Sequence, residues 1–235
     1  MDEESYITFA CPKCGNSVEY LEQYVGTAQV CPYCSEDVVV PRDGDEKGAT
    51  LPLPIETSRL ILRRLRSDDF PDAFEFLSDT EVYRYDERPP MDEDEAKRWL
   101  DRTAKGKLSD PEGELTLGIA LKDNGRLVGF VRLKYRDANR KQAGLGAAIN
   151  SKYHRQGFAY EALHAALQFS FRDIGLHRVV AMCDSRNAAG VALLTKLGMR
   201  NEAECLRDRF VDGEWSDSLW FAMLEEEFPH GQPNK

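Results

Sequence analysis

The chain has 235 residues, of which 42% are hydrophobic, 31% charged and 10% aromatic. This composition is typical of a globular protein with a sizeable core and excludes a fibrous or wholly disordered chain. The length fits one large domain, or one domain with a small appendage. The net charge is −10, and residues 1–50 hold ten acidic and only three basic residues. Because binding to phosphate backbones needs a basic surface, nucleic acid is disfavoured as the main partner.

Two features of the sequence bear on its compartment. It contains no run of 18 or more apolar residues, the length that a membrane-spanning helix needs. It begins with Met1-Asp2-Glu3-Glu4, which is acidic where a secretory signal is basic and then apolar. We therefore expect a cytoplasmic protein with no membrane partner.

Four of the six cysteines form two C-x-x-C pairs, Cys11-Pro12-Lys13-Cys14 and Cys31-Pro32-Tyr33-Cys34. In a chain with no export signal this spacing predicts a zinc site, since four thiolates suit tetrahedral Zn²⁺ with no open position. Two redox pairs or two disulfides remain alternatives, but a reducing compartment disfavours them. The segment resembles small zinc ribbons, and its structural Zn²⁺ would be needed for folding rather than for catalysis. The predicted ligands are Cys11, Cys14, Cys31 and Cys34.

The stretch after the second cysteine pair is typical of a linker. Arg42-Asp43-Gly44-Asp45-Glu46-Lys47-Gly48 is polar, and Pro52 and Pro54 follow. Such a segment buries too little apolar surface to order itself. The sequence therefore predicts a zinc ribbon at residues 1–41, a linker at 42–54, a larger domain at 55–228 and a tail at 229–235.

Beyond the linker, hydrophobic patterning predicts alternating strands and helices. Asn124-Gly125 between two apolar runs indicates a hairpin. The expected strands are 59–65, 115–122, 127–135, 143–150 and 178–183, with helices at 68–77, 92–105, 157–174 and 187–197 and a final hairpin around Asp212-Gly213. This order predicts an α+β (α/β) fold, with one mixed sheet and helices on both of its faces.

The joint between the fourth of these strands and the long helix is the most informative part of the chain. Gly157 and Ala159 lack bulk where the helix begins, so a phosphate group could approach the free N–H groups there. Lys152, His154 and Arg155 add positive charge. Glycine is also common at such turns for geometric reasons alone, so these residues by themselves leave both interpretations open.

Several motifs lie in a characteristic order along residues 57–225. They are Thr57-Ser58-Arg59-Leu60-Ile61-Leu62-Arg63, the run from His154 to Leu163, Asn187, Lys196-Leu197-Gly198-Met199 and Trp215-Ser216-Asp217-Ser218. With these motifs the chain resembles the GNAT superfamily of acetyl-CoA-dependent N-acetyltransferases. The branch it resembles most is that of the ribosomal-protein N-terminal acetyltransferases. The resemblance implies a GNAT-like acetyl-CoA-binding domain behind the small zinc ribbon.

The resemblance also implies where acetyl-CoA lies. Its pantetheine arm would pair like an added strand with the fourth strand, and its pyrophosphate would rest on the amides at the start of the long helix. His154 replaces the usual Gln or Arg of the family's phosphate motif, which leaves the backbone donors in place. Asn187 matches a family asparagine that is expected to contact the cofactor arm or an ordered water, although an N-cap role is equally open. The implied cofactor-binding residues are Ala147, Ala148, Ile149, His154, Arg155, Gln156, Gly157, Phe158, Ala159, Tyr160 and Asn187.

The implied reaction is acyl transfer from a thioester to a primary amine, and here the sequence departs from its relatives. Many carry a serine three residues after the asparagine, where this chain has Gly190, and others carry a tyrosine within the stretch that reads Leu193-Leu194-Thr195 here. Neither usual proton donor to the leaving thiolate is present. Glu114, Asp184 and Asp217 are candidates for a base acting through water, and the catalytic residues remain unassigned.

The absence of an evident base favours an acceptor that loses its proton readily. A terminal α-amine has a pKa of about 7.7–8.0 and lysine one of about 10.4. Removing the proton from lysine therefore costs about 3.4 kcal/mol more free energy. The sequence therefore predicts direct acetylation of a protein or peptide N-terminus in a ternary complex. A small-molecule amine acceptor and an acyl-CoA-binding regulator without turnover remain alternatives.

Two further expectations concern partners. The acidic residues Asp86, Glu87 and Asp92–Glu95 are expected near the acceptor opening, where they would attract a cationic acceptor. The acidic zinc ribbon is a candidate surface for a protein partner.

Overall fold

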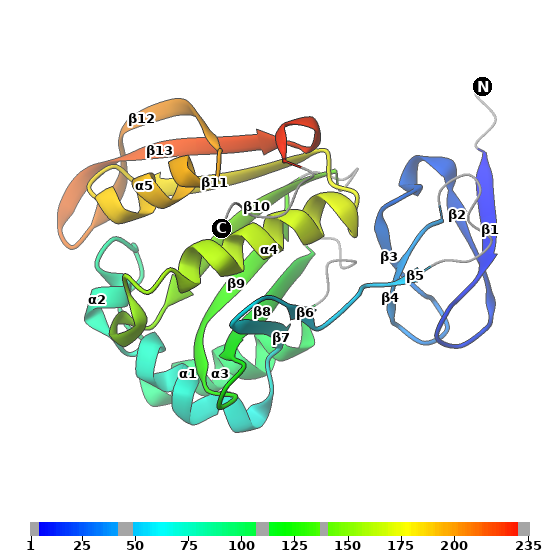
Figure 1. Ribbon diagram of the computed structural model, residues 1–235, viewed down its shortest axis with the longest axis horizontal. Helices are drawn as coiled ribbons and strands as arrows, with labels where there is room; N and C mark the ends of the chain where they lie inside the picture. The colour runs from blue at the N-terminus through cyan, green and yellow to red at the C-terminus, as the bar shows by residue number, and fades with distance from the viewer. Residues whose placement is uncertain (1–4, 42–48, 107–112, 137–140, 230–235) are drawn as a thin grey trace.

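The computed structural model describes residues 5–41, 49–106, 113–136 and 141–229. Part of the expected linker, residues 42–48, and the expected tail from residue 230 lie outside these ranges. The described chain forms an N-terminal module with two small sheets and a main domain built on one eight-stranded sheet (Figure 1). Within the described ranges, every helix is too short or too polar to cross a membrane.

The N-terminal module consists of short antiparallel pairings. One sheet joins β1 (Tyr6–Ala10) to β2 (Ser17–Leu21), and the other joins β3 (Ala28–Val30), β4 (Asp37–Val39) and β5 (Ala49–Thr50). The 3₁₀ turn η1 (Glu22–Tyr24) connects the two sheets. The strand β5 comes from the second half of the expected linker and completes the second sheet by pairing with β4.

The main sheet has the strand order β12-β13-β11-β10-β9-β8-β7-β6. All its neighbouring strands are antiparallel except β10 and β11, which are parallel. The predicted mixed sheet is confirmed. Its strands are β6 (Ile55–Glu56), β7 (Leu60–Arg64), β8 (Glu114–Leu121), β9 (Leu127–Tyr135), β10 (Gln142–Ile149), β11 (Arg178–Asp184), β12 (Arg200–Val211) and β13 (Glu214–Leu224).

Helices cover both faces of this sheet, as the patterning predicts. On one face α4 (Phe158–Arg172) and α5 (Ala188–Lys196) pack into the main core, while α1 (Phe70–Leu77) and α3 (Glu93–Lys105) form a second core on the other face. The short helix α2 (Thr80–Tyr83) was not predicted. The remaining 3₁₀ turns are η2 (Ser67–Asp69), η3 (Ser151–Tyr153) and η4 (Glu225–Glu227).

The N-terminal module contacts the main domain. Ala28 of β3 belongs to the main hydrophobic core. Buried Asp37 of β4 pairs with Arg64 of β7 at 3.2 Å, and the same guanidinium donates to the carbonyl of Gly106 at the end of α3 (2.8 Å). The module is therefore packed against the main domain rather than only tethered to it.

Close packing of α5 on β11 accounts for Gly190. The side-chain oxygen of Asn187 accepts a hydrogen bond from the N–H of Gly190 (2.9 Å) and caps the helix. A Cβ atom on Gly190 would lie 2.7 Å from the sulfur of Cys183 and 2.9 Å from the amide nitrogen of Asn187, so the space that a serine would need is occupied. Burial raises the pKa of the Cys183 thiol to about 11, so the thiol stays protonated near neutral pH.

This packing predicts that Gly190→Ser is destabilising by about 1–3 kcal/mol, the typical cost of overpacking. Combining it with Cys183→Ala removes the nearest clash, so the double variant is expected to be more stable than the sum of the two single effects predicts. Denaturant unfolding measures all three variants, with Ala189→Ser on the exposed side of the same helix as the matched control. Strictly additive costs would contradict the contact.

Candidate functional site

The strands β10 and β11 pair over only the first part of their length. Their register runs from Gln142 opposite Arg178 to Gly144 opposite Val180 and ends there. Beyond this point β10 continues along β9, and β11 continues along β13. The two neighbouring strands thus separate after Gly144, and the edge of β10 from Leu145 to Ile149 has no partner strand among the described residues.

The loop at the end of β10 presents a row of free backbone donors. The N–H groups from Arg155 to Tyr160 have no hydrogen-bond acceptor in the part of the chain that the structure describes, and the next one, that of Glu161, bonds to the carbonyl of Gly157 (3.1 Å). Within the described ranges, no side chain caps α4. Arg155 and Gly157 have positive φ angles of 60° and 82°. Consecutive N–H groups turned outward at a helix N-terminus form a site for anions.

The carboxylate of Glu161, in the first turn of α4, fixes this loop to the start of β7. It accepts hydrogen bonds from the hydroxyls of Thr57 (2.6 Å) and Ser58 (2.9 Å) and from the backbone N–H of Arg59 (2.8 Å). The Arg59 side chain adds an ion pair at 2.7 Å. Burial alone would raise the pKa of Glu161, but these hydrogen bonds outweigh it and lower the pKa.

The guanidinium of Arg59 also reaches the loop itself. It donates to the carbonyl of Gln156 (2.9 Å) and lies 4.5 Å from the ring centre of Phe158. A Cβ atom on Gly157 would lie 3.3 Å from this guanidinium. The pairing of Arg59 with Glu161 joins residues about a hundred positions apart and was not predicted from the sequence. The polar triplet Thr57-Ser58-Arg59 just before a buried strand was the signal in the sequence that could have indicated this pairing.

The basic residues expected near the phosphates have different surroundings. Lys152 pairs with Glu75 of α1 at 2.5 Å. That hydrogen bond, with others from Arg126 and Asn150, lowers the pKa of Glu75 to about 2. The Nε2 atom of His154 contacts the carbonyl of Ile149 (2.9 Å).

Among these basic residues, Arg155 alone has no partner among the described residues, and it is exposed. It remains available to a bound anion.

The candidate bases do not come together in one cluster. Asp184 and Asp217 lie near each other at the ends of β11 and β13, since Asp184 is opposite Ser218. Glu114 begins β8, on the far side of β9 from β10.

Asp184 is engaged by a neighbouring arginine. It is 2% exposed and forms two side-chain hydrogen bonds with Arg186 (3.0 and 2.9 Å). Burial acts to raise the pKa of Asp184, but the bonds from Arg186 lower it below its usual value. A carboxylate held in this way is a poor proton acceptor.

The acids expected to attract a cationic acceptor are largely used within the protein. Asp86 forms a two-point ion pair with Arg88, and Glu87 lies 3.4 Å from the guanidinium of Arg209. Asp92 caps α3, and Glu93 pairs with Lys97. These residues therefore offer little free negative charge.

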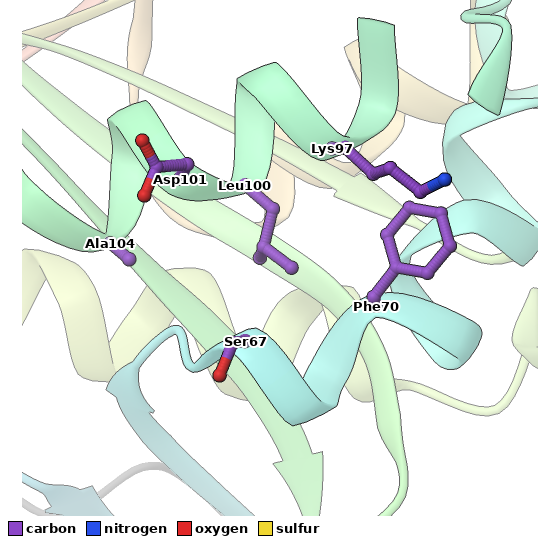
Figure 2. Close-up of a pocket in the computed structure, with 6 residues that line it drawn as sticks. All are labelled: Ser67, Phe70, Lys97, Leu100, Asp101 and Ala104. Carbon is purple, nitrogen blue, oxygen red and sulfur yellow. The ribbon is translucent and has the colours of Figure 1, made fainter. Parts of the chain in front are cut away.

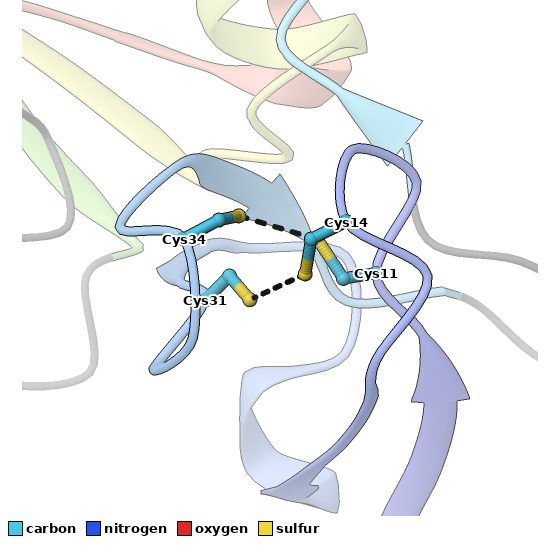
Figure 3. Close-up of side chains that lie close together, drawn as sticks. All are labelled: Cys11, Cys14, Cys31 and Cys34. Atoms are coloured by element: carbon cyan, nitrogen blue, oxygen red, sulfur yellow. Dashed lines mark hydrogen bonds between the residues drawn. The ribbon is translucent and has the colours of Figure 1, made fainter.

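The four N-terminal cysteines converge (Figure 3). Their sulfur atoms all lie within 4.8 Å of one another, and the contacts Cys11–Cys34 and Cys14–Cys31 are 3.7 Å each. Sulfurs bound at 2.3 Å around a tetrahedral zinc ion would be about 3.8 Å apart, whereas a disulfide would bring them to about 2.05 Å. Burial raises the pKa of Cys11, but backbone N–H groups of Cys14 and Lys13 outweigh it and lower the pKa to about 7. The arrangement fits Zn²⁺.

A surface hollow lies elsewhere on the main domain, between η2, the start of α1 and α3 (Figure 2). Its lining residues are Ser67, Phe70, Lys97, Leu100, Asp101 and Ala104. Because none of them comes from β10, β11 or α4, this hollow is separate from the splayed strands.

Comparison with known proteins gives consistent results over the main domain. An uncharacterized N-acetyltransferase, YnaD of Bacillus subtilis, is 29% identical over 174 residues, which cover 74% of this chain and 98% of YnaD. A GNAT-family acetyltransferase structure from Bacillus anthracis superposes with a TM-score of 0.67 at 26% identity and covers 74% of this chain and 99% of its own.

Two further relatives have named acceptors, and they differ. The ribosomal protein uS5-alanine N-acetyltransferase of Escherichia coli is 30% identical over 88 residues, 37% of this chain and 45% of that protein. The spermidine N(1)-acetyltransferase of the same organism is 21% identical over 105 residues, 45% of this chain and 56% of that protein. The comparisons therefore leave the acceptor open.

The acetyltransferase (GNAT) domain family matches residues 59–200, from β7 to the start of β12. This match covers the splayed strands, the row of free amides and the Arg59–Glu161 ion pair. The chain belongs to the GNAT family and is an N-acetyltransferase.

Proposed function

We propose that the enzyme transfers the acetyl group of acetyl-CoA to the α-amine of a protein or peptide N-terminus. The binding of acetyl-CoA is supported by the row of N–H groups from Arg155 to Tyr160, which have no partner among the described residues and lie beside the free edge of β10. A pyrophosphate carries the negative charge that such a helix start attracts. The residues present fit acetyl-CoA.

The direction of the cofactor follows from the chain order. The free amides come after the end of β10, so a pantetheine arm leaving them runs back along Ala147, Ala148 and Ile149 toward the point where β11 joins. The thioester then lies near Gly144 and Gly146. On this strand Leu145 and Ile149 belong to the main core, so the glycines face the opposite side, where an amine has room to approach.

Asn187 has a place in this scheme beside its structural role. Its side-chain oxygen is used to cap α5, while its amide nitrogen has no partner among the described residues. That nitrogen is free to donate to the cofactor arm. Both roles considered for this asparagine are therefore compatible.

The proposed acceptor class depends on how readily the acceptor amine loses its proton. When bound, acetyl-CoA supplies an activated thioester carbonyl, and the amine must be neutral to attack it. A positioned base typically contributes 10²–10⁴-fold, and the one buried candidate, Asp184, is held by Arg186. An α-amine needs less help than lysine because its pKa is about 2.5 units lower. The relative that acetylates ribosomal protein uS5 on alanine supports the same class of acceptor.

A panel of acceptors at saturating acetyl-CoA tests this function. We expect a free N-terminal peptide to be acetylated faster than the same peptide with a blocked N-terminus and an internal lysine, and faster than spermidine. If chemistry limits the rate, kcat/KM is expected to rise with pH and level off near the acceptor's own pKa. Faster acetylation of the internal lysine or of spermidine would contradict the proposed acceptor.

We also propose that Cys11, Cys14, Cys31 and Cys34 bind one structural Zn²⁺ per chain. Elemental analysis of protein purified without chelator is expected to find one zinc. Cys31→Ser is expected to lose the metal and lower the melting temperature, because metal binding supplies folding free energy to so small a module. Cys205→Ser, at a cysteine outside the cluster, is the matched control. A metal-free wild-type protein with an unchanged fold would contradict this site.

A further inference from the structure

Arg132 of β9 lies on the face of the main sheet opposite α4. Its neighbours Val131 and Leu133 belong to the core under α4, and successive side chains of a strand point to opposite faces. The register places Arg132 between Thr116 of β8 and Gly146 of β10. These three residues form one row across the sheet.

The guanidinium of Arg132 has no hydrogen bond or ion pair with any described residue, although it is half-buried. The hydroxyl of Thr116 in the same row is also without a partner, in a side chain that is 2% exposed. The acid on this face of β8, Glu114, does not come within ion-pair distance of Arg132. Other arginines in this part of the molecule are paired, as Arg88 is with Asp86.

This unpaired charge lies where the acceptor must approach. Pairing between β10 and β11 ends at Gly144, and Gly146 is the next residue on the same face. A Cβ atom on Gly146 would lie 4.0 Å from the Arg132 guanidinium. On the facing strand Met182 is 40% exposed. A side chain of the acceptor can therefore reach Arg132 while its amine is at the thioester.

We propose that Arg132, with the hydroxyl of Thr116, binds the carboxylate of an acidic residue next to the acceptor's N-terminal amine. This inference rests on the proposed function and deepens it by naming the acceptor class. A guanidinium fork matches a carboxylate at two points, and a half-buried, unpaired polar group gains most from such a partner. The same charge repels a polyamine.

Three peptides that differ only in their second residue, Ser-Glu, Ser-Gln and Ser-Lys, test the proposal with the full-length enzyme. We expect kcat/KM to be about tenfold higher for Ser-Glu than for Ser-Lys, the size expected for one charge-assisted pair near solvent. The difference is expected mainly in KM. Arg132→Met, which keeps the apolar stem, is expected to abolish the preference while retaining turnover of Ser-Gln.

Two more variants separate binding from a purely structural role. Arg132→Lys is expected to restore part of the preference, because it keeps the charge but not the fork. Thr116→Val is expected to weaken the preference without lowering the melting temperature, since it removes a buried hydroxyl that has no partner. Lys134→Met, which removes the exposed charge two residues further along the same face of β9, is the control and is expected to leave the preference in place.

The outcomes distinguish this inference from the proposed function. Peptides acetylated at equal rates, or an acidic preference that survives in Arg132→Met, would overturn the inference and leave the proposed function standing. If no peptide is acetylated, a small α-amino acid and its amide are tested as acceptors in place of the peptides. Arg132-dependent preference for the free carboxylate would then support the anion site and contradict the peptide acceptor. Preference for the amide or for spermidine would overturn both.

Discussion

The structure around the proposed cofactor site depends on six consecutive N–H groups for which the described part of the chain provides no acceptor. Backbone donors are normally paired, and a long helix usually gains a side-chain cap. Here Gly157 begins α4 with a positive φ and no capping group. Glu161, which could have reached back toward these donors, is instead bound to Thr57 and Arg59. The loop is thereby held in one shape while its donors remain free.

Contacts from several parts of the chain fix the position of this loop relative to the free edge of β10. Arg59, just before β7, donates a hydrogen bond to the loop. Glu75 of α1 accepts hydrogen bonds from Lys152 and Asn150 just after β10. Donors that are already in place need no rearrangement when the ligand binds, so their dipoles stabilise its negative charge at no reorganisation cost. The N-terminal module adds to this frame because Asp37 pairs with Arg64 on the same strand, β7.

Local signals in the sequence were sufficient for the features that depend on neighbouring residues. The strand β9 occupies the predicted residues, α4 lies within the predicted range, and the four cysteines converge as their spacing predicts. Long-range pairings were beyond reach. The acid Glu87 was expected to attract the acceptor, but packing brings it to Arg209, far along the chain. Asp86, expected to do the same, pairs with its near neighbour Arg88. The role proposed for Arg132 could not be predicted from the sequence, because only the strand register places this residue beside Gly146.

The departure at Gly190 has a structural reason in the contact between α5 and β11. The sulfur of Cys183 fills the space that a side chain at this position would need. The sequence shows both residues but not their contact, since they come from a strand and the helix after it. The serine, one of the two usual proton donors of the family, is therefore absent for a packing reason.

Amide hydrogen exchange with and without acetyl-CoA tests the central claim most directly. The N–H groups from Arg155 to Tyr160 have no acceptor among the residues that the structure describes, so in the free enzyme they should exchange rapidly although they lie at the start of a stable helix. Acetyl-CoA is expected to slow exchange at these six positions, and also at Ala147 to Ile149 on the free edge of β10. Unchanged exchange at both segments, with protection elsewhere in the molecule, would contradict the account.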